Sequence, residues 1–355
     1  MCERRVCTQC TQLLEVLPVG VEDCLFINVW VPPVCLMGGG GGPAACPVAV
    51  FSHGGDLTMG DSSMYNMSAL SAATGQVIAS YNYRLGLLGF LALNALREGD
   101  PRGDTSGGLL CAPGAVCLGS DRVLPGNYGL LDQQLALRWV QDNIAAFGGD
   151  KARVMVFGQS SGGTSVLAML ASPASRGLFS SAASLSGSPN MSMPLGVMET
   201  RNLPIVTAVG CGNATGSGVR ACLQALPANA FPSSQPDSWA MNDQSGACGS
   251  DGCRATWCGQ REGSLTGLPD NLNGENYPGF IVVDKITVVA SLFDALAIPL
   301  IDVPLMIGAM AQVCRVCGVR VCERDGGDVC DPCRKLISLR TTTFTAQMRA
   351  PSRRC

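Results

Sequence analysis

The chain has 355 residues, enough to bury a sizeable core in one large domain or two small ones. Its net charge of −3 and predicted pI near 5.3 argue against a general electrostatic attraction to nucleic acid. Hydrophobic residues make up 47% of the sequence, but no apolar run reaches membrane-spanning length. We therefore expect a soluble globular protein with no membrane span and no nucleic-acid partner.

Cysteine is unusually abundant, with 19 residues, and this number favours an oxidising compartment. Because the number is odd, at least one thiol stays free or pairs with another chain. The segment from Met1 to Cys7 contains no apolar stretch of the kind found in a signal peptide. We expect an extracellular or secretory-pathway protein, although either the start is incomplete or the chain is not exported.

The first half of the chain alternates strand patterns with helix patterns. Apolar, β-branched runs predict strands at 22–32, 47–52 and 76–83, and a buried segment follows at 84–91. Residues 129–147 form an amphipathic pattern that predicts a helix. Its expected apolar side consists of Leu130, Leu131, Leu135, Trp139, Val140 and Ile144. This alternation predicts an α/β fold with a mostly parallel central sheet and helices on both faces.

The segment 153–167 is the strongest functional pattern. Val154–Phe157 predicts a buried strand, Gly158–Gly162 matches G-x-S-x-G, and a helical pattern begins at about Ser165. A strand, a tight turn and a helix are the context in which this pentapeptide forms a nucleophile elbow. The sequence therefore predicts that Ser160 presents its hydroxyl at the end of a strand.

A second glycine-rich segment, His53-Gly54-Gly55-Asp56, follows the predicted strand at 47–52. Backbone N–H groups in such a loop can point into a cavity without obstruction by side chains, which suits an oxyanion hole. His53 is the only histidine in the chain. Its place before the glycines suggests that it braces the loop and does not act as a base.

Later in the chain, 179–186, 281–284 and 303–308 predict further strands, while 187–280 is mixed and loop-rich. Cys111 and Cys117 are close enough in sequence to close a small disulfide loop.

Taken together, these segments resemble the type-B carboxylesterase and cholinesterase family of α/β-hydrolases, from about Glu22 to Gln312. The resemblance rests on collinear motifs at 22–30, 53–55, 82–86, 126–133, 139–144, 147–150, 157–163 and 303–308. It implies a partial hydrolase domain over 1–312 that is truncated at both ends, because the family's domain normally begins earlier and continues further.

The resemblance also implies a serine esterase that needs no cofactor and acts on small-molecule esters. Ser160 would be the nucleophile, and Gly55, Asp56 and Ser161 would supply the oxyanion N–H groups, with Gly54 in the same loop. Asp56 replaces the family's third loop glycine.

The family's disulfides would correspond to Cys211–Cys222 and to Cys24 with Cys7 or Cys10. Arg84 and Asp132 match a structural ion pair of the family.

The triad pattern breaks after the nucleophile. In this fold the order is Ser, acid, His, yet no histidine follows Ser160, and Val313 occupies the position of the family's acid. Lys285 is a conceivable substitute base that nothing in the sequence places near Ser160. We therefore expect an ester hydrolase that is impaired or inactive in this chain. The alternative is a non-catalytic cholinesterase-like protein used for binding or adhesion.

The break coincides with a change in composition. Residues 313–355 contain nine Lys and Arg, four Asp and Glu, and six cysteines. We interpret this basic, irregular tail as unrelated to the family, and our hypothesis is a translated intron or a misjoined exon. The rival interpretation is a zinc site formed by Cys314, Cys317, Cys330 and Cys333, whose spacing is shorter than that of a usual zinc ribbon.

Overall fold

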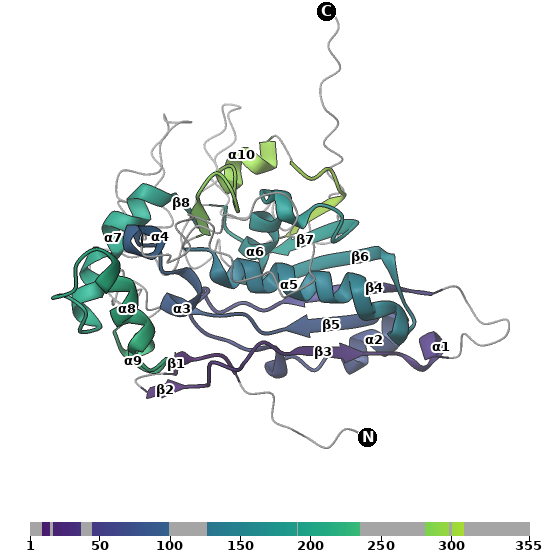
Figure 1. Ribbon diagram of the computed structural model, residues 1–355. Coiled ribbons are helices and arrows are strands. Elements are labelled where there is room, and N and C mark those ends of the chain that lie inside the picture. Colours follow the sequence, from purple (N-terminus) through teal and green to yellow (C-terminus); the bar gives the residue numbers. More distant parts are fainter. Residues whose placement is uncertain are drawn as a thin grey trace, which may run out of the picture.

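The computed structural model describes residues 9–14, 17–36, 45–98, 126–189, 191–234, 281–297 and 300–308. Its main feature is a six-stranded sheet in the order β10-β7-β6-β4-β5-β3 (Figure 1). The strands are β3 (Ile27–Trp30), β4 (Cys46–Ser52), β5 (Val77–Tyr81), β6 (Gly149–Gln159), β7 (Ser181–Leu185) and β10 (Leu305–Gly308). Only β3 runs antiparallel to its neighbour, so the predicted mostly parallel sheet is confirmed.

The central strands are covered on both faces. All five residues of β5 and the last five of β4 are buried. Successive side chains of a strand point to opposite faces, so a strand that is buried throughout has protein on both sides. The apolar runs that predicted these strands are therefore the core of the sheet.

Two helices, α5 (Tyr128–Asn143) and α6 (Ser161–Leu170), pack against the sheet and against each other. The buried side of α5 differs from the predicted one, because Leu135 is 41% exposed. Its place is taken by Gln133 and Gln134, which are both fully buried. Gln133 accepts hydrogen bonds from Ser52 and Tyr81 and donates one to Ser165, so it joins β4, β5, α5 and α6.

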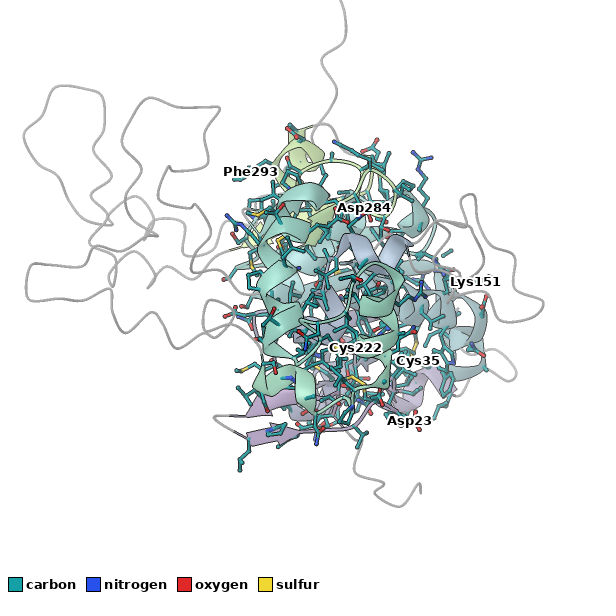
Figure 2. The ribbon with its side chains drawn as sticks, turned by 60° about the vertical axis from the view of Figure 1, so that its left-hand side comes forward. Asp23, Cys35, Lys151, Cys222, Asp284 and Phe293 are labelled. Atoms are coloured by element: carbon teal, nitrogen blue, oxygen red, sulfur yellow. A yellow bond between two sulfur atoms is a disulfide. The ribbon has the colours of Figure 1, made fainter. Side chains whose placement is uncertain are left out.

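The remaining helices are short, except α7, which has 14 residues. They are α1 (Pro33–Leu36), α2 (Ser68–Thr74), α3 (Gly86–Phe90), α4 (Asn94–Glu98), α7 (Leu195–Ala208), α8 (Ser217–Ala225), α9 (Ala230–Ser233) and α10 (Leu292–Ala297), with 3₁₀ turns at Ser62–Met64, Ile144–Phe147 and Pro173–Ser175. Helices α7, α8 and α9 gather beside α3 and α4 at one end of the sheet (Figure 1). The side chains fill the space between these elements, and Phe293 of α10 lies at the margin with 52% exposure (Figure 2).

Two small sheets were not predicted. Near the start of the chain, β1 (Gln12–Leu14) pairs antiparallel with β2 (Leu17–Val19). The other pairs β8 (Ser192–Pro194) with β9 (Ile281–Val283), so the predicted strand at 281–284 exists but lies outside the main sheet. The side chain of Asn127 holds β9 in place through hydrogen bonds with the N–H and C=O groups of Val282.

Three disulfides occur among the described residues. Cys211 pairs with Cys222, as the resemblance implied, and Cys24 pairs with Cys10 and not with Cys7. The third, Cys35–Cys46, was not predicted. Cys111 and Cys117 lie outside the described residues.

None of the helices in the described ranges is both long and apolar enough to cross a membrane.

Candidate active site

Ser160 occupies the junction between β6 and α6 with φ 57° and ψ −128°. A non-glycine residue rarely adopts a positive φ, and such conformations persist only where the surrounding structure enforces them. Here the N–H of Ser160 donates to the carbonyl of Leu185 at 2.8 Å, and its own carbonyl accepts from the N–H of Thr164 at 3.0 Å. Ser160 is half-buried, so its side chain is not sealed inside the protein. The predicted strand, turn and helix are all present.

Glycine is required on both sides of Ser160 because the backbone is crowded there. A Cβ atom at Gly162 would collide with the carbonyl oxygen of Ser52 and lie 2.7 Å from that of His53. A Cβ atom at Gly158 would collide with the backbone of Gly162. The first turn of α6 therefore packs directly on the end of β4.

The glycine-rich loop after β4 lies beside Ser160. A Cβ atom on Gly54 would stand 2.7 Å from the carbonyl oxygen of Gln159 and 3.1 Å from the Cβ of Ser160, so the loop packs closely on the elbow. The loop then turns through three positive φ angles, 116° at Gly55, 55° at Asp56 and 62° at Leu57. The N–H of Leu57 donates to the hydroxyl of Ser161 at 3.1 Å, which fastens the loop to α6.

The N–H groups of Gly55, Asp56 and Ser161 make no hydrogen bond with any other described residue. The carbonyl of each of their peptide units is nevertheless held. Gly54 C=O accepts from His53 Nδ1 at 2.9 Å, and Gly55 C=O accepts from the N–H groups of Thr58 and Met59. Because the carbonyl and N–H of a trans peptide point in opposite directions, fixing the carbonyl also fixes the N–H. Such a set of fixed, unused donors beside a serine hydroxyl has the chemistry of an oxyanion hole.

His53 is only 1% exposed and stacks on Tyr83, with ring centroids 4.4 Å apart. Since Gly54 C=O can only accept, Nδ1 carries the ring proton. The other ring nitrogen, Nε2, is buried and has no hydrogen-bond partner among the described residues. Burial lowers the pKa of His53 to about 4, so the ring is neutral at pH 7. The imidazole of His53 therefore lies against the backbone of the glycine-rich loop, where it holds the Gly54 carbonyl.

Asp56 adopts a left-handed backbone conformation, and the residue is partly buried. Burial raises the pKa of this carboxyl above its usual range.

The other residues considered from the sequence lie as follows. Lys285 is exposed and donates to the carbonyl of Val289, and Arg84 forms a bidentate ion pair with Asp132 at 2.7 Å.

Val313 and the four cysteines of the zinc alternative are outside the described residues. Within the described ranges, no group of three or more His, Cys, Asp and Glu side chains could hold a metal ion.

A model described as "Carboxylesterase family" matches residues 2–99 and 114–248, which is more than half of the chain. The chain belongs to the carboxylesterase family. It is similar to cocaine esterase from Oryctolagus cuniculus, with 42% identity over 158 residues that make up 44% of this chain and 24% of that protein. It is also similar to acetylcholinesterase from Gallus gallus, with 41% identity over 201 residues that make up 55% of this chain and 22% of that protein.

Among solved structures, a PNB esterase has 25% sequence identity to the chain and a TM-score of 0.61. The alignment covers 90% of this carboxylesterase chain and 54% of that one. The structural likeness supports the α/β-hydrolase fold. The segments that match the two curated relatives span about a quarter of the length of each.

The crowding at the elbow predicts a contrast between two glycines of this carboxylesterase. Gly162→Ala should destabilise the protein by about 3 kcal/mol or more, because two backbone carbonyls must move. Gly196→Ala, in α7, meets no atom within 4 Å and should stabilise the protein by about 0.5–1 kcal/mol through its helix propensity. Urea denaturation of both variants and the parent measures the difference, and equal effects would contradict the packing described above.

The buried imidazole predicts a loss of stability in acid. The pKa of His53 in the folded protein lies near 4, below its ordinary value of 6.5, so between these values the unfolded chain binds a proton that the folded chain excludes. The stability linked to neutral His53 is present above about pH 6.5 and is lost as the pH falls toward 4, by roughly 3 kcal/mol in total.

Unfolding free energies at about pH 7 and about pH 4.5 should therefore differ more in the parent than in His53→Gln. Because the chain has one histidine, the difference between the two proteins isolates this group. The same pH dependence in both would refute the assignment.

Proposed function

We propose that this chain acts on carboxylic esters through Ser160. The observation that carries the proposal is the placement of Ser160, on a strained strand-to-helix turn in direct contact with a loop of unused backbone donors. The hydroxyl oxygen of Ser160 attacks the acyl carbon, and the substrate carbonyl oxygen becomes an oxyanion. The N–H groups of Gly55, Asp56 and Ser161 donate to that oxygen. The acyl carbon–oxygen bond of the ester then breaks, the alcohol leaves with the proton that the Ser160 hydroxyl gives up, and water later hydrolyses the acyl-enzyme to the acid and free Ser160.

Membership of the carboxylesterase family supports this reaction, as do the names of the two curated relatives, cocaine esterase and acetylcholinesterase. We assign a small carboxylic ester as the substrate without choosing a particular one. The low aromatic content of 5% gives no support for an aromatic-lined pocket for quaternary ammonium groups.

The structure places no histidine as a general base for Ser160 in the part of the chain that it describes. The only histidine, His53, uses its ring N–H to hold Gly54 C=O and is enclosed by the protein. Removing the triad histidine alone costs about 10⁶-fold in kcat in subtilisin. We therefore propose that Ser160 is acylated slowly by activated esters and that turnover of the 355-residue chain is impaired.

Covalent labelling tests the nucleophile. A fluorophosphonate probe should form a single adduct on Ser160, detectable by intact-mass and peptide mass spectrometry. Ser160→Ala should abolish the adduct. Ser180→Ala, which removes an exposed serine immediately before β7, should leave it unchanged. Labelling that survives in Ser160→Ala, or no labelling of the parent during prolonged incubation, would contradict the proposal.

Asp56 should restrain the same reaction. Its carboxylate stands on a residue whose N–H we assign to the oxyanion hole, so it opposes the developing negative charge. Asp56→Asn should accelerate labelling of Ser160 by removing the charge. Asp56→Gly should accelerate it similarly and also stabilise the fold by about 1 kcal/mol, since φ 55° no longer strains a side chain.

In the parent, labelling should slow as the pH rises through the elevated pKa of Asp56, because the carboxyl group then becomes charged. Both variants should lose this feature of the pH profile. Comparing the two variants separates charge from backbone strain. A parent and an Asp56→Asn variant with the same labelling rate at neutral pH would show that the carboxylate points away from the oxyanion.

A further inference from the structure

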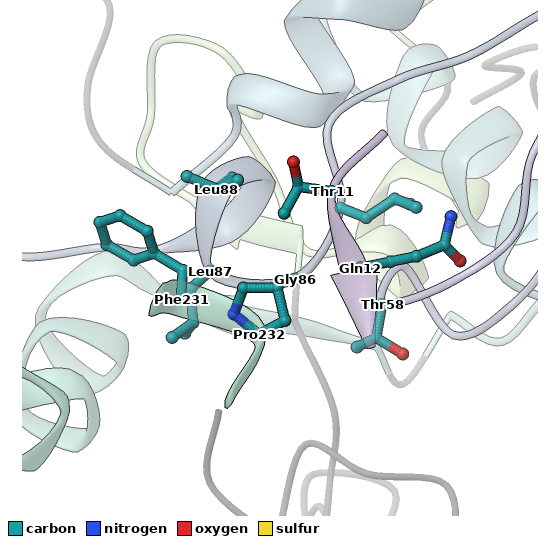
Figure 3. Close-up of a pocket in the computed structure, with 9 residues that line it drawn as sticks. Thr11, Gln12, Thr58, Gly86, Leu87, Leu88, Phe231 and Pro232 are labelled. Atoms are coloured by element: carbon teal, nitrogen blue, oxygen red, sulfur yellow. The ribbon is translucent and has the colours of Figure 1, made fainter. Parts of the chain in front are cut away.

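Gln12, the first residue of β1, connects this strand to the segment that follows the glycine-rich loop at 53–57, called the oxyanion loop below. Its side chain is 5% exposed and pairs with both backbone groups of Gly60. Its Oε1 accepts from Gly60 N–H at 2.7 Å, and its Nε2 donates to Gly60 C=O at 3.1 Å. Nε2 also donates to the carbonyl of Cys10 at 3.1 Å, so all three polar contacts of this amide are with backbone. Gln12 and Thr58 of the loop line the same small pocket (Figure 3).

We propose that Gln12 is a positioning residue for the oxyanion hole, acting through Gly60 and His53; this inference rests on the proposed function of Ser160. Gly60 has φ 108°, and a Cβ atom there would stand 2.6 Å from Gly54 C=O and 2.7 Å from His53 Nδ1. Gly60 is therefore packed on the hydrogen bond that fixes the Gly54 carbonyl. If Gly60 shifts, that hydrogen bond loses its packing support.

The direction of one oxyanion donor depends on that hydrogen bond. Gly54 C=O and Gly55 N–H belong to the same planar peptide unit. While His53 holds the carbonyl on one side of the loop, the N–H is directed to the other. A chain of contacts thus runs from the Gln12 amide to Gly60, to His53 and Gly54, and to the Gly55 N–H.

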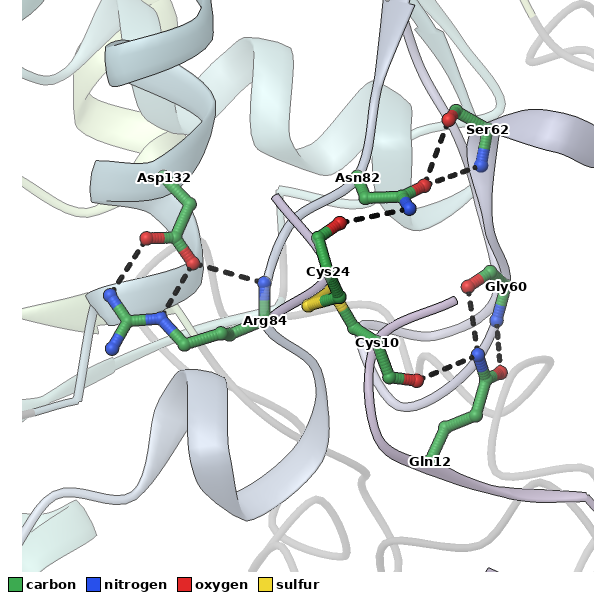
Figure 4. The surroundings of a disulfide bond; sticks show 8 residues. All are labelled: Cys10, Gln12, Cys24, Gly60, Ser62, Asn82, Arg84 and Asp132. Atoms are coloured by element: carbon green, nitrogen blue, oxygen red, sulfur yellow. Dashed lines mark hydrogen bonds and ion pairs between the residues drawn. A yellow bond between two sulfur atoms is a disulfide. The ribbon is translucent and has the colours of Figure 1, made fainter. Parts of the chain in front are cut away.

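The Cys10–Cys24 disulfide anchors the Gln12 end of this series of contacts (Figure 4). On one side, Cys10 C=O accepts from the Gln12 amide. On the other, Cys24 C=O accepts from Asn82, whose Oδ1 accepts from both the N–H and the hydroxyl of Ser62 at 2.8 Å. The segment from Gly60 to Ser62 is therefore bound at both ends by side chains that are anchored on the two bridged cysteines.

Labelling kinetics of full-length variants test the proposal. Gln12→Met keeps the length of the side chain but removes every hydrogen bond of its amide. The matched control is Gln134→Met, because Gln134 is likewise buried and its amide donates to Ser172 and Ser175, away from the loop. Each protein is incubated with the fluorophosphonate probe over a range of concentrations at a temperature where all are folded. The maximal rate constant, the half-saturating concentration and the final labelled fraction are recorded.

Gln12→Met should lower the maximal rate constant by about 10- to 100-fold and leave the half-saturating concentration unchanged, because only the transition state uses the displaced N–H. The final labelled fraction should stay complete, whereas partial unfolding would lower that fraction. Gln134→Met should label like the parent. If Gln12→Met does not fold, Gln12→Glu replaces it, and the same slowing is expected because its carboxylate faces the carbonyls of Gly60 and Cys10.

A Gln12 variant that labels at the parental rate, or a Gln134 variant that is slowed equally, overturns the positioning role and leaves the proposed function standing. A parent that is not labelled at Ser160 overturns both, since there is then no oxyanion to stabilise. The two failures are thus told apart by the parent protein alone.

Discussion

The site depends on one close contact, the packing of the first turn of α6 on the end of β4. This contact forces the chain to reverse within a single residue after β6, and that residue, Ser160, is left at a positive φ with its side chain at the tip of the strand. It also brings the loop that leaves β4 into contact with Ser160. The close backbone approach that leaves no room for a side chain at Gly162 therefore brings the two parts of the proposed catalytic geometry together, the nucleophile and the loop of backbone donors.

The loop itself is an unfavourable structure that its surroundings maintain. Asp56 and Leu57 both adopt left-handed conformations, which cost non-glycine residues about 1–2 kcal/mol each. His53 holds one end of the loop from below, and Ser161 accepts a hydrogen bond from Leu57 at the other. Donors that are held in place before the reaction need no reorganisation when negative charge develops, and this is why an oxyanion hole is built from backbone in a rigid setting.

Much of this arrangement could be predicted from sequence, because it depends on local patterns. Apolar runs predicted β4, β5 and β6, and glycine spacing predicted the elbow around Ser160. The pairing of Cys24 with Cys10 was left open, since Cys7 and Cys10 are nearly equivalent in sequence and only the register of β1 decides between them. Gln12 was missed because its proposed role depends on contacts with Gly60, 48 residues away. Leu135 was misplaced because a helical pattern cannot show that two glutamines will be buried by hydrogen bonds to other elements.

The Cys35–Cys46 bond has a consequence for how this carboxylesterase tolerates change. It ties α1 to the first residue of β4, and Cys46 is also held by a hydrogen bond from its N–H to Gly148 C=O. The start of β4 is therefore fixed independently of the ten residues between the two cysteines, which include five consecutive glycines. The strand that leads to the glycine-rich loop beside Ser160 is thus anchored at its start by a covalent bond and a backbone hydrogen bond, whatever sequence joins the two cysteines.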